Sequence, residues 1–243
     1  STMRHQLSKL RCLKQRLKAS SRRMGTPHGR ERWGGKDPVP GRESGLSPPQ
    51  RKLLTLETEP VANTITVKGV LSVDECNAVI RTVEEAGMEL QTSRGPAYGE
   101  AERRHSRAAF DDATFAAGLW ACGLDEALKD LRVGRRRPVG LNENIRVYRY
   151  EPGDVFGKHI DASNTTAMGR TEYTLLVYLA GGSDGLTGGE TAFYDRGREI
   201  LRVAPIAGSA LLHQHGQACL LHEALPVLSG TKYILRSDVV FSE

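Results

Sequence analysis

The spacing of apolar residues divides the chain into a helical part and a strand-rich part. Over about residues 60–132, apolar side chains recur every three or four positions, the period of an amphipathic helix. The clearest run is Cys76, Val79, Ile80 and Val83. Ser72 and Glu75 have the spacing of an N-terminal capping box. Gly87 suits the end of a helix, so we predict a helix from Val73 to Ala86.

Two further helices are predicted in the same part of the chain. Phe115, Leu119 and Trp120 indicate a helix that begins near Asp111 or Asp112, and Leu124, Leu128 and Leu131 indicate a third. A first strand is expected over residues 65–67, before the first helix. Residues 91–107 are polar and contain Gly, so we expect a strand and a mobile loop there.

From Asn144 onward, short apolar runs alternate with turns that contain Gly or Pro, which is typical of strands. Eight runs are expected to be strands: 145–150, 155–161, 173–179, 191–194, 201–204, 209–213, 217–222 and 232–241. Short strands at regular spacing favour a jelly roll, the cupin-like double-stranded β-helix. We therefore predict an α+β fold with a jelly-roll core over about residues 140–243 and the helices on one outer face.

Charge separates the N-terminal segment from the rest. Residues 1–50 hold 12 Lys and Arg against 3 Asp and Glu, a net charge of +9. Residues 51–243 hold 22 against 26, a net charge of −4, so the overall +5 comes from the first fifty residues. We predict that residues 1–50 are a basic, flexible extension and that residues 51–243 are one domain.

The basic extension has three interpretations. Leu7, Leu10, Leu13 and Leu17 lie at helical spacing among Arg and Lys, and a Gly-, Pro- and Arg-rich run follows. This composition is typical of a solvated extension, of an organelle transit peptide, or of a segment that binds nucleic acid or another acidic partner.

Cysteine spacing and hydropathy indicate an intracellular protein. Cys12, Cys76, Cys122 and Cys219 are scattered without a C-x-x-C pair, so we expect thiols in a reducing compartment, the cytoplasm or the nucleus. No apolar run approaches the length of a transmembrane helix, and no secretory signal is visible.

The candidate chemistry centres on His159 and Asp161. Residues i and i+2 of a strand point to the same face, so this imidazole and this carboxylate are expected side by side. A second histidine, His222, follows in a later strand, and Lys232 comes ten residues after it. Two histidines and one carboxylate leave three coordination positions open, which suits non-haem Fe(II). A zinc hydrolase fits the same three ligands, but it gives Lys232 no role.

The last predicted strand contributes two cations to one face. One face of this strand carries Lys232, Ile234 and Arg236, because side chains two positions apart point the same way. By the same rule, one face of an earlier strand carries Tyr148 and Tyr150. A buried unpaired ammonium is costly, so an inward Lys232 needs an anion. A dicarboxylate co-substrate that reaches from the metal would supply this charge.

Five segments, in this order, resemble the Fe(II)- and 2-oxoglutarate-dependent dioxygenases in their prolyl 4-hydroxylase-like branch. They are residues 144–161, which contain His159 and Asp161, then 173–179, the Gly-Gly-Glu-Thr-Ala-Phe run 188–193, residues 205–212, and 222–233 with His222 and Lys232. The resemblance covers roughly residues 62–243. It implies that His159, Asp161 and His222 bind Fe(II) and are the catalytic residues.

The resemblance also implies a binding site for 2-oxoglutarate. Lys232 would pair with the distal carboxylate through charge-assisted hydrogen bonds. Tyr150 and Thr174 stand where the family often adds hydroxyl donors to that carboxylate. Arg236 is the rival anchor, since related families use an Arg further from the distal histidine.

Other histidines and one cysteine are not expected to hold the iron. His213 and His215 form an i, i+2 pair, but no carboxylate lies beside them and the family spacing favours His222. His105 has no spaced partner, so we expect it on the surface. Cys219 is expected to be a core thiol.

The implied activity is hydroxylation by an oxidoreductase that uses Fe(II), 2-oxoglutarate and O₂, with ascorbate as a further cofactor that the resemblance allows. A prolyl residue in a peptide or protein is the leading substrate. A small molecule, a free amino acid or a nucleic acid is the alternative, as is a non-catalytic module that binds the metal and 2-oxoglutarate. The loop over residues 94–107 is the segment expected to close over a bound chain.

Overall fold

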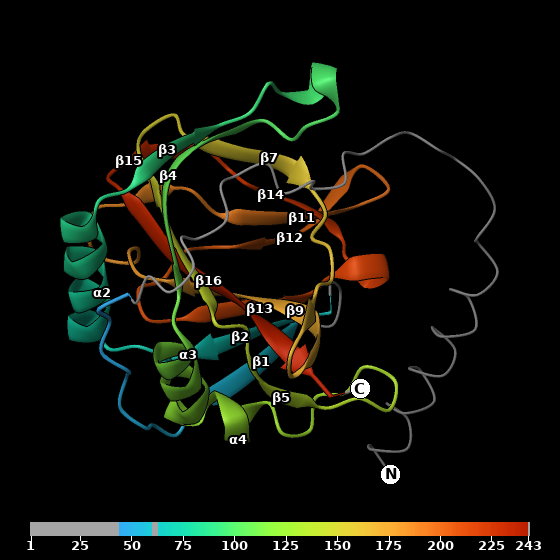
Figure 1. Cartoon of the computed structure of the whole chain (residues 1–243). Coiled ribbons are helices and arrows are strands. Elements are labelled where there is room, and N and C mark those ends of the chain that lie inside the picture. The colour runs from blue at the N-terminus through green and yellow to red at the C-terminus, as the bar shows by residue number, and fades with distance from the viewer. Residues whose placement is uncertain (1–43, 60–62, 243) are drawn as a thin grey trace, which may run out of the picture.

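Strands dominate the computed structural model, which describes residues 44–59 and 63–242 (Figure 1). The strands are β1 (Thr55–Glu59), β2 (Thr64–Lys68), β3 (Glu89–Thr92), β4 (Arg103–Asp111), β5 (Pro138–Leu141), β6 (Asn144–Tyr150), β7 (Val155–His159), β8 (Thr165–Thr166), β9 (Gly169–Tyr178), β10 (Thr187–Gly188), β11 (Thr191–Asp195), β12 (Arg198–Val203), β13 (Ala210–Gln214), β14 (Leu221–Ala224), β15 (Val227–Ser229) and β16 (Lys232–Phe241). Most of the predicted extension, with its basic helix and linker, lies outside the described residues.

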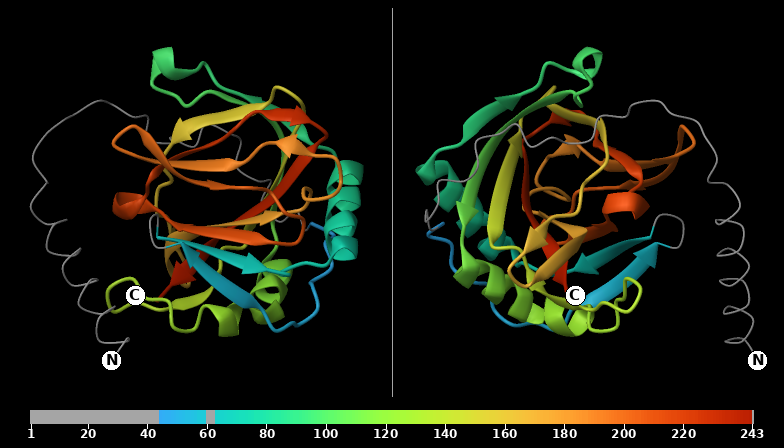
Figure 2. Two further views of the ribbon diagram at one scale, coloured as in Figure 1. Left: turned by 180° about the vertical axis from the view of Figure 1, so that it is seen from behind. Right: turned by 45° about the vertical axis from the view of Figure 1, so that its right-hand side comes forward.

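One sheet holds fourteen of these strands, in the order β1-β2-β13-β9-β16-β6-β4-β7-β14-β11-β12, with β3, β5 and β8 attached beside β4, β16 and β9. The sheet curves round so that β7, β14, β11 and β12 face the longer β9, β13 and β16 (Figures 1 and 2). β10 and β15 form a separate pair. The predicted α+β double-stranded β-helix is confirmed.

The curved sheet has two walls, a short one of β7, β14, β11 and β12 and a longer one that includes β9, β13 and β16 (Figure 1). Side chains of the longer wall point alternately to its two faces, and each face has a hydrophobic core. The inner core lies between the two walls and includes Tyr150, Tyr178 and Ile234. The outer core lies under the helices and includes Leu175 and Leu235. Because successive side chains of a strand point to opposite faces, Ile234 places Lys232 and Arg236 on the inner side as well.

Helix α2 (Val73–Ala86) has both predicted bounds. The Ser72 hydroxyl accepts a hydrogen bond from the Glu75 amide at 3.1 Å, and the Glu75 carboxylate accepts one from the Ser72 amide at 2.7 Å, which confirms the capping box. Gly87 ends the helix with φ of +84°. The buried Val79 and Val83 join the outer core, so this helix supports the sheet from outside.

The predicted second helix is α3 (Ala113–Leu119), capped by the Asp112 carboxylate, which accepts from the Phe115 amide at 2.8 Å. The predicted third helix is wrong in length. The chain continues from α3 through a π-helical turn, η2 (Trp120–Leu124), into only three residues of α4 (Asp125–Ala127). Gly123 has φ of +133°, and a Cβ there would lie 2.3 Å from the Lys52 carbonyl oxygen, so this close approach interrupts the helix.

Residues 44–50, predicted to belong to the extension, contact the domain. The Ser44 hydroxyl donates to the Asp112 carboxylate, and Leu46 is buried in the outer core. No helix within residues 44–59 and 63–242 is long and apolar enough to cross a membrane. Cys76, Cys122 and Cys219 form no disulfide.

Two strand boundaries near the site differ from prediction. Residues 89–111 form a hairpin, β3 and β4 around the short helix η1 (Pro96–Tyr98), where a strand and a loop were expected. The strand expected over 217–222 begins only at Leu221. Gly216, with φ of +72°, instead starts the short helix η3 (Gly216–Ala218). The hairpin inserts β4 between β6 and β7 and so joins the two walls.

Candidate metal centre and active site

His159 is the last residue of β7, and Asp161 follows two residues later. The His159 Nε2 atom lies 3.7 Å from Asp161 Oδ1, and the two side chains are 4% and 1% exposed. His222 on β14 is paired in register with His159, and the ring centroids are 4.3 Å apart. The structure therefore brings together the three predicted iron ligands, with one ligand atom from each within 4.8 Å of the others.

Backbone carbonyls fix the orientation of both imidazoles. His159 Nδ1 lies 2.8 Å from the Gly157 oxygen, and His222 Nδ1 lies 2.9 Å from the Leu220 oxygen. An Nδ1–H that donates to a carbonyl leaves the Nε2 lone pair for a metal. Burial lowers the pKa of His159 and of His222, which keeps both rings neutral as metal ligation requires. The Phe156 ring stacks on His159 at 3.7 Å and holds its plane.

The two carboxylate oxygens of Asp161 have different surroundings. Oδ2 accepts hydrogen bonds from the Thr174 hydroxyl at 2.6 Å and pairs with Arg236 Nη2 at 3.0 Å. Oδ1 is buried and has no hydrogen-bond partner among the described residues. Burial raises the pKa of Asp161, but Arg236 and then the imidazoles lower it well below its usual range, so the group is a carboxylate. Oδ1 and the two Nε2 atoms thus fit a metal ion.

Arg236 and Thr174 lie at the metal end of the cavity. Sequence placed Thr174 beside the distal carboxylate of 2-oxoglutarate and made Arg236 the rival anchor for that carboxylate. Both side chains instead contact Asp161, and Thr174 also lies 3.3 Å from His215 Nδ1. Register explains this position, because β9 and β16 pair Thr174 with Asp238 and Leu176 with Arg236, beside the end of β7.

Lys232 lies deeper between the walls and is fully buried. Its ammonium donates to the Gly189 carbonyl oxygen and lies 5.2 Å from the centroid of the Tyr150 ring and 6.0 Å from that of Tyr178. In the described part of the chain, no carboxylate forms an ion pair with it. Burial lowers the pKa of Lys232 to about 7, although the more distant Glu190 raises it. Tyr150 is its partner in the β6–β16 ladder.

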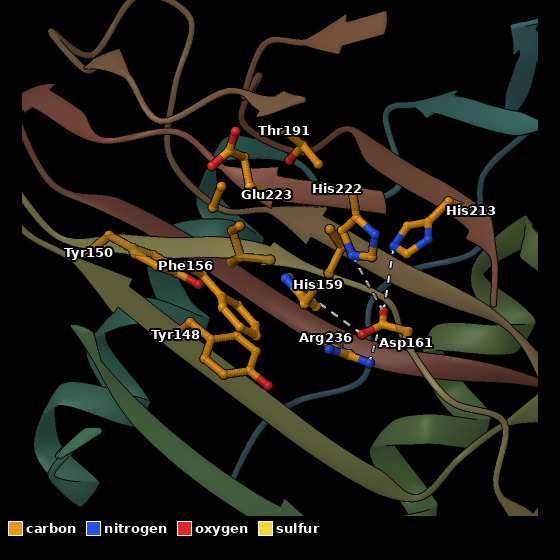
Figure 3. A pocket seen from close by; sticks show the side chains of 13 residues that line it. Tyr148, Tyr150, Phe156, His159, Asp161, Thr191, His213, His222, Glu223 and Arg236 are labelled. Carbon is orange, nitrogen blue, oxygen red and sulfur yellow. Dashed lines mark ion pairs between the residues drawn. The ribbon is translucent and has the colours of Figure 1, made fainter. Parts of the chain in front are cut away.

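A cavity of about 40 Å³ lies beside the ligand atoms (Figure 3). Within 3.9 Å of the Asp161 carboxylate lie nitrogens of His159, His213, His222 and Arg236, and dashed lines mark these pairs in Figure 3. The cavity is lined by Tyr148, Tyr150, Phe156, His159, Asp161, Leu176, Thr191, His213, His222, Glu223, Ala224, Ile234 and Arg236.

Two further histidines lie near the site, and one of them, His105, is placed differently from the sequence prediction. His105, expected on the surface, is 1% exposed on β4 and lies 5.0 Å from both the Tyr148 and Tyr150 rings. Burial and the neighbouring arginines 103 and 107 lower its pKa to about 3. His213 is buried against the site, with its ring 4.4 Å from that of His222. Its parity with the inward Leu211 on β13 was the available signal.

Comparisons with known proteins agree with this geometry. Residues 145–237 match the family model of the 2OG-Fe(II) oxygenase superfamily. The chain contains a 2OG-Fe(II) oxygenase domain. This domain match identifies an oxidoreductase of the 2-oxoglutarate-dependent dioxygenase class, and the class implies Fe(II), 2-oxoglutarate and O₂. Comparison of the sequence with curated proteins gives no match.

Several solved structures share the fold of this oxygenase. A viral collagen prolyl hydroxylase from Paramecium bursaria Chlorella virus-1 is 20% identical, with a TM-score of 0.51 over 74% of this chain and 96% of that chain. A Pseudomonas putida prolyl-4-hydroxylase is 18% identical, with a TM-score of 0.50 over 74% and 92%. A Trichoplax adhaerens prolyl hydroxylase, solved with a hypoxia-inducible factor peptide, is 18% identical, with a TM-score of 0.52 over 73% and 83%. These identities establish the fold alone.

Proposed function

We propose that this oxygenase hydroxylates a prolyl residue in a peptide or protein, with Fe(II) held by His159, Asp161 and His222. The observation that carries the proposal is the convergence of their three ligand atoms within 4.8 Å, with the Lys232 ammonium against the Tyr150 and Tyr178 rings of the inner core. When bound, Fe(II) and 2-oxoglutarate supply the activation of O₂ that hydroxylation needs. The chain contributes ligands, an anchor for the co-substrate and a cavity that limits the access of water.

Lys232 is the proposed anchor for the distal carboxylate of 2-oxoglutarate. Its ammonium is buried against a carbonyl and two aromatic rings, and a carboxylate would add the opposite charge that these groups do not supply. Tyr150 lies beside it and is the proposed hydroxyl donor. Arg236 and Thr174 are proposed to hold the metal ligand Asp161 in place.

Co-substrate binding requires movement of side chains in the cavity. A volume of about 40 Å³ holds roughly three water molecules at about 10–15 Å³ each, which is less than a five-carbon diacid needs. Ile234 lies between Lys232 and Arg236 on the inner face of β16, so we expect the side chains around it to move apart when 2-oxoglutarate enters.

The β3–β4 hairpin favours a chain-like substrate. It projects beyond the rest of the molecule beside β7 (Figure 1). Its base is held by the pairing of Arg103 with Phe156, next to the metal ligands. Arg103, Arg107 and Gln91 line a second small cavity that shares Tyr148, Phe156 and Arg236 with the first. A projecting hairpin at the edge of the site is suited to cover an extended peptide.

The proposal is tested by an anaerobic titration of the protein with Fe(II) and 2-oxoglutarate. A visible charge-transfer band appears only if both bind at one site, so we expect it in the unchanged protein and not in His159→Ala. Succinate formation should fall by more than about a hundredfold in that variant, beyond the loss typical of outer-shell changes. His28→Ala, in the basic extension, is the matched control. Equal succinate rates in His159→Ala and the unchanged protein would refute the assignment of His159.

A peptide library analysed by mass spectrometry then tests the substrate. We expect the gain of one oxygen atom on proline-containing peptides, with ascorbate added as reductant. Turnover of small molecules alone would refute the prolyl assignment while leaving the oxygenase intact. An intracellular, reducing compartment remains the prediction for the location of the protein.

A further inference from the structure

A second group of metal-binding side chains lies next to the proposed iron ligands and shares His222 with them. One ligand atom each of His213, Cys219 and His222 lies within 4.8 Å of the other two. His213 and His222 are buried, and Cys219 is half-buried. The first group joins two nitrogens to a carboxylate oxygen, whereas this group joins two nitrogens to a sulfur.

The imidazole of His213 points to a ligand at this position. It is 2% exposed, and neither ring nitrogen has a hydrogen-bond partner among the described residues. A neutral imidazole carries one donor and one acceptor, and burying both without partners costs free energy. Its Nε2 lies 3.7 Å from Asp161 Oδ2, an oxygen that Thr174 and Arg236 already contact. The His213 ring therefore has a nitrogen lone pair near the site that accepts no hydrogen bond from the described residues and can bind a metal ion.

The thiol of Cys219 supplies the third donor. Its Sγ lies 3.9 Å from His222 Nδ1, accepts a hydrogen bond from the Asp161 amide at 3.3 Å and donates one to the Leu220 carbonyl oxygen at 3.4 Å, so the sulfur lies beside the metal ligands. A thiolate is a soft ligand, and a set of two imidazoles and one thiolate suits Zn²⁺ and Co²⁺. The carboxylate-containing set suits Fe(II) instead.

We propose that His213, Cys219 and His222 form a second, thiolate-containing metal position that takes a zinc-like ion and competes with the iron position for His222. Binding replaces the thiol proton of Cys219, which leaves to solvent. The ion takes His222 through Nδ1, the nitrogen 3.9 Å from the sulfur, so the ring proton moves from Nδ1 to Nε2 and Nε2 no longer has a lone pair for iron. The competition rests on the proposed function, because it requires His222 to be an iron ligand. A zinc-like ion at this position withdraws His222 and stops the oxygenase.

The test is a titration of the full chain with Co²⁺ in the absence of 2-oxoglutarate. A thiolate-to-cobalt charge-transfer band in the near ultraviolet is expected in the unchanged protein and in His159→Ala. Cys219→Ser and His213→Phe, the second of which keeps a ring of similar volume, should lose the band. Cys12→Ser removes another thiol and should keep it. Absence of the band from the unchanged protein, or its survival in Cys219→Ser or His213→Phe, would overturn the proposal.

Zinc inhibition supplies a second readout. Zn²⁺ should inhibit succinate formation at least about tenfold less effectively in His213→Phe than in the unchanged protein. The visible band of Fe(II) with 2-oxoglutarate should survive in His213→Phe, which also shows that this variant folds. Equal zinc inhibition in both proteins would overturn the competition. If iron supports no succinate formation while the cobalt band still depends on Cys219 and His213, the oxygenase proposal fails and the thiolate position stands.

Discussion

Two buried cations on the inner face of β16, Arg236 and Lys232, lie four residues apart and have different partners. Arg236 pairs with the Asp161 carboxylate at 3.0 Å. Lys232 donates to a backbone carbonyl, that of Gly189, and no carboxylate in the described part of the chain pairs with it. A buried charge needs an opposite charge, and among residues 44–59 and 63–242 a carboxylate pairs with Arg236 but none pairs with Lys232. The difference indicates that Arg236 holds the metal ligand Asp161 in place and that Lys232 binds an anionic ligand.

The largest expected effect comes from removing the cation that is already paired. Arg236→Met leaves the buried Asp161 carboxylate without its guanidinium, which typically costs about 3–5 kcal/mol of unfolding free energy. A divalent metal ion bound to Asp161 would replace much of that charge. We therefore expect a large loss of stability in urea unfolding with a chelator present and a much smaller loss with Fe(II) under anaerobic conditions.

The matched control for Arg236→Met is Arg202→Met, which breaks an exposed pair with Glu199 and should change stability little under either condition. A loss in Arg236→Met that Fe(II) does not reduce would contradict the assignment of Arg236 to the metal ligand.

Removing the other cation, Lys232, should weaken the binding of 2-oxoglutarate without lowering the free energy of unfolding. Lys232→Met removes a charge-assisted hydrogen bond worth about 1.5–3 kcal/mol, so KM for 2-oxoglutarate should rise about 10- to 150-fold. Burial of the ammonium is itself costly, so the variant should not unfold more easily. Steady-state succinate formation measures KM, with Lys68→Met, an exposed lysine, as control. A variant with unchanged KM would make Arg236 the anchor after all.

The sequence was sufficient to predict features that depend on the residues of one local segment. The capping box Ser72–Glu75 and Gly87 determined both bounds of α2, because a helix end needs only its own residues. The bounds of β16 also agree with prediction. Strand parity placed His159 beside Asp161, and the resemblance to the dioxygenase family selected His222 as the third ligand, and the structure brings the three together.

Features that depend on neighbouring strands were not accessible from one sequence. The register of β9 and β16 determines which side chains contact Asp161, so the contacts of Thr174 and Arg236 with this carboxylate were not predicted. The burial of His105 follows from the insertion of β4 between β6 and β7, which its polar sequence does not indicate. Parity gives His213 the same face of β13 as Leu211, but only the pairing of β13 with β9 brings it beside Thr174 and the site.

The titration of Lys232 sharpens the comparison, because the guanidinium of Arg236 stays charged at all accessible pH values. Burial lowers the pKa of Lys232 to about 7. Only the charged ammonium attracts a carboxylate, and the bound carboxylate raises this pKa again. Above pH 7, binding of 2-oxoglutarate must therefore take up a proton, and KM should rise by up to about tenfold per pH unit. Below pH 7, where Lys232 is already charged, its titration should not change KM with pH.

The matched variant for this titration is Lys232→Arg, which keeps a positive charge that does not titrate. Its KM for 2-oxoglutarate should stay level between pH 7 and pH 8.5, a range chosen to lie above the pKa of about 7. The same slope in Lys232→Arg and in the unchanged protein would assign the pH dependence to another group.

The smallest expected effect separates the hydroxyl of Tyr150 from its ring. The ring lies 5.2 Å from the Lys232 ammonium, a cation–π distance, and the hydroxyl is the proposed donor to the co-substrate. Tyr150→Phe keeps the ring and removes the donor, so losing one hydrogen bond of about 0.5–1.5 kcal/mol should raise KM for 2-oxoglutarate about 2- to 13-fold. Tyr150→Leu removes both and should raise KM further. If Tyr150→Phe has the KM of the unchanged protein and Tyr150→Leu does not, Tyr150 acts only through its ring, and the carboxylate depends on Lys232 alone for its charge-assisted bond.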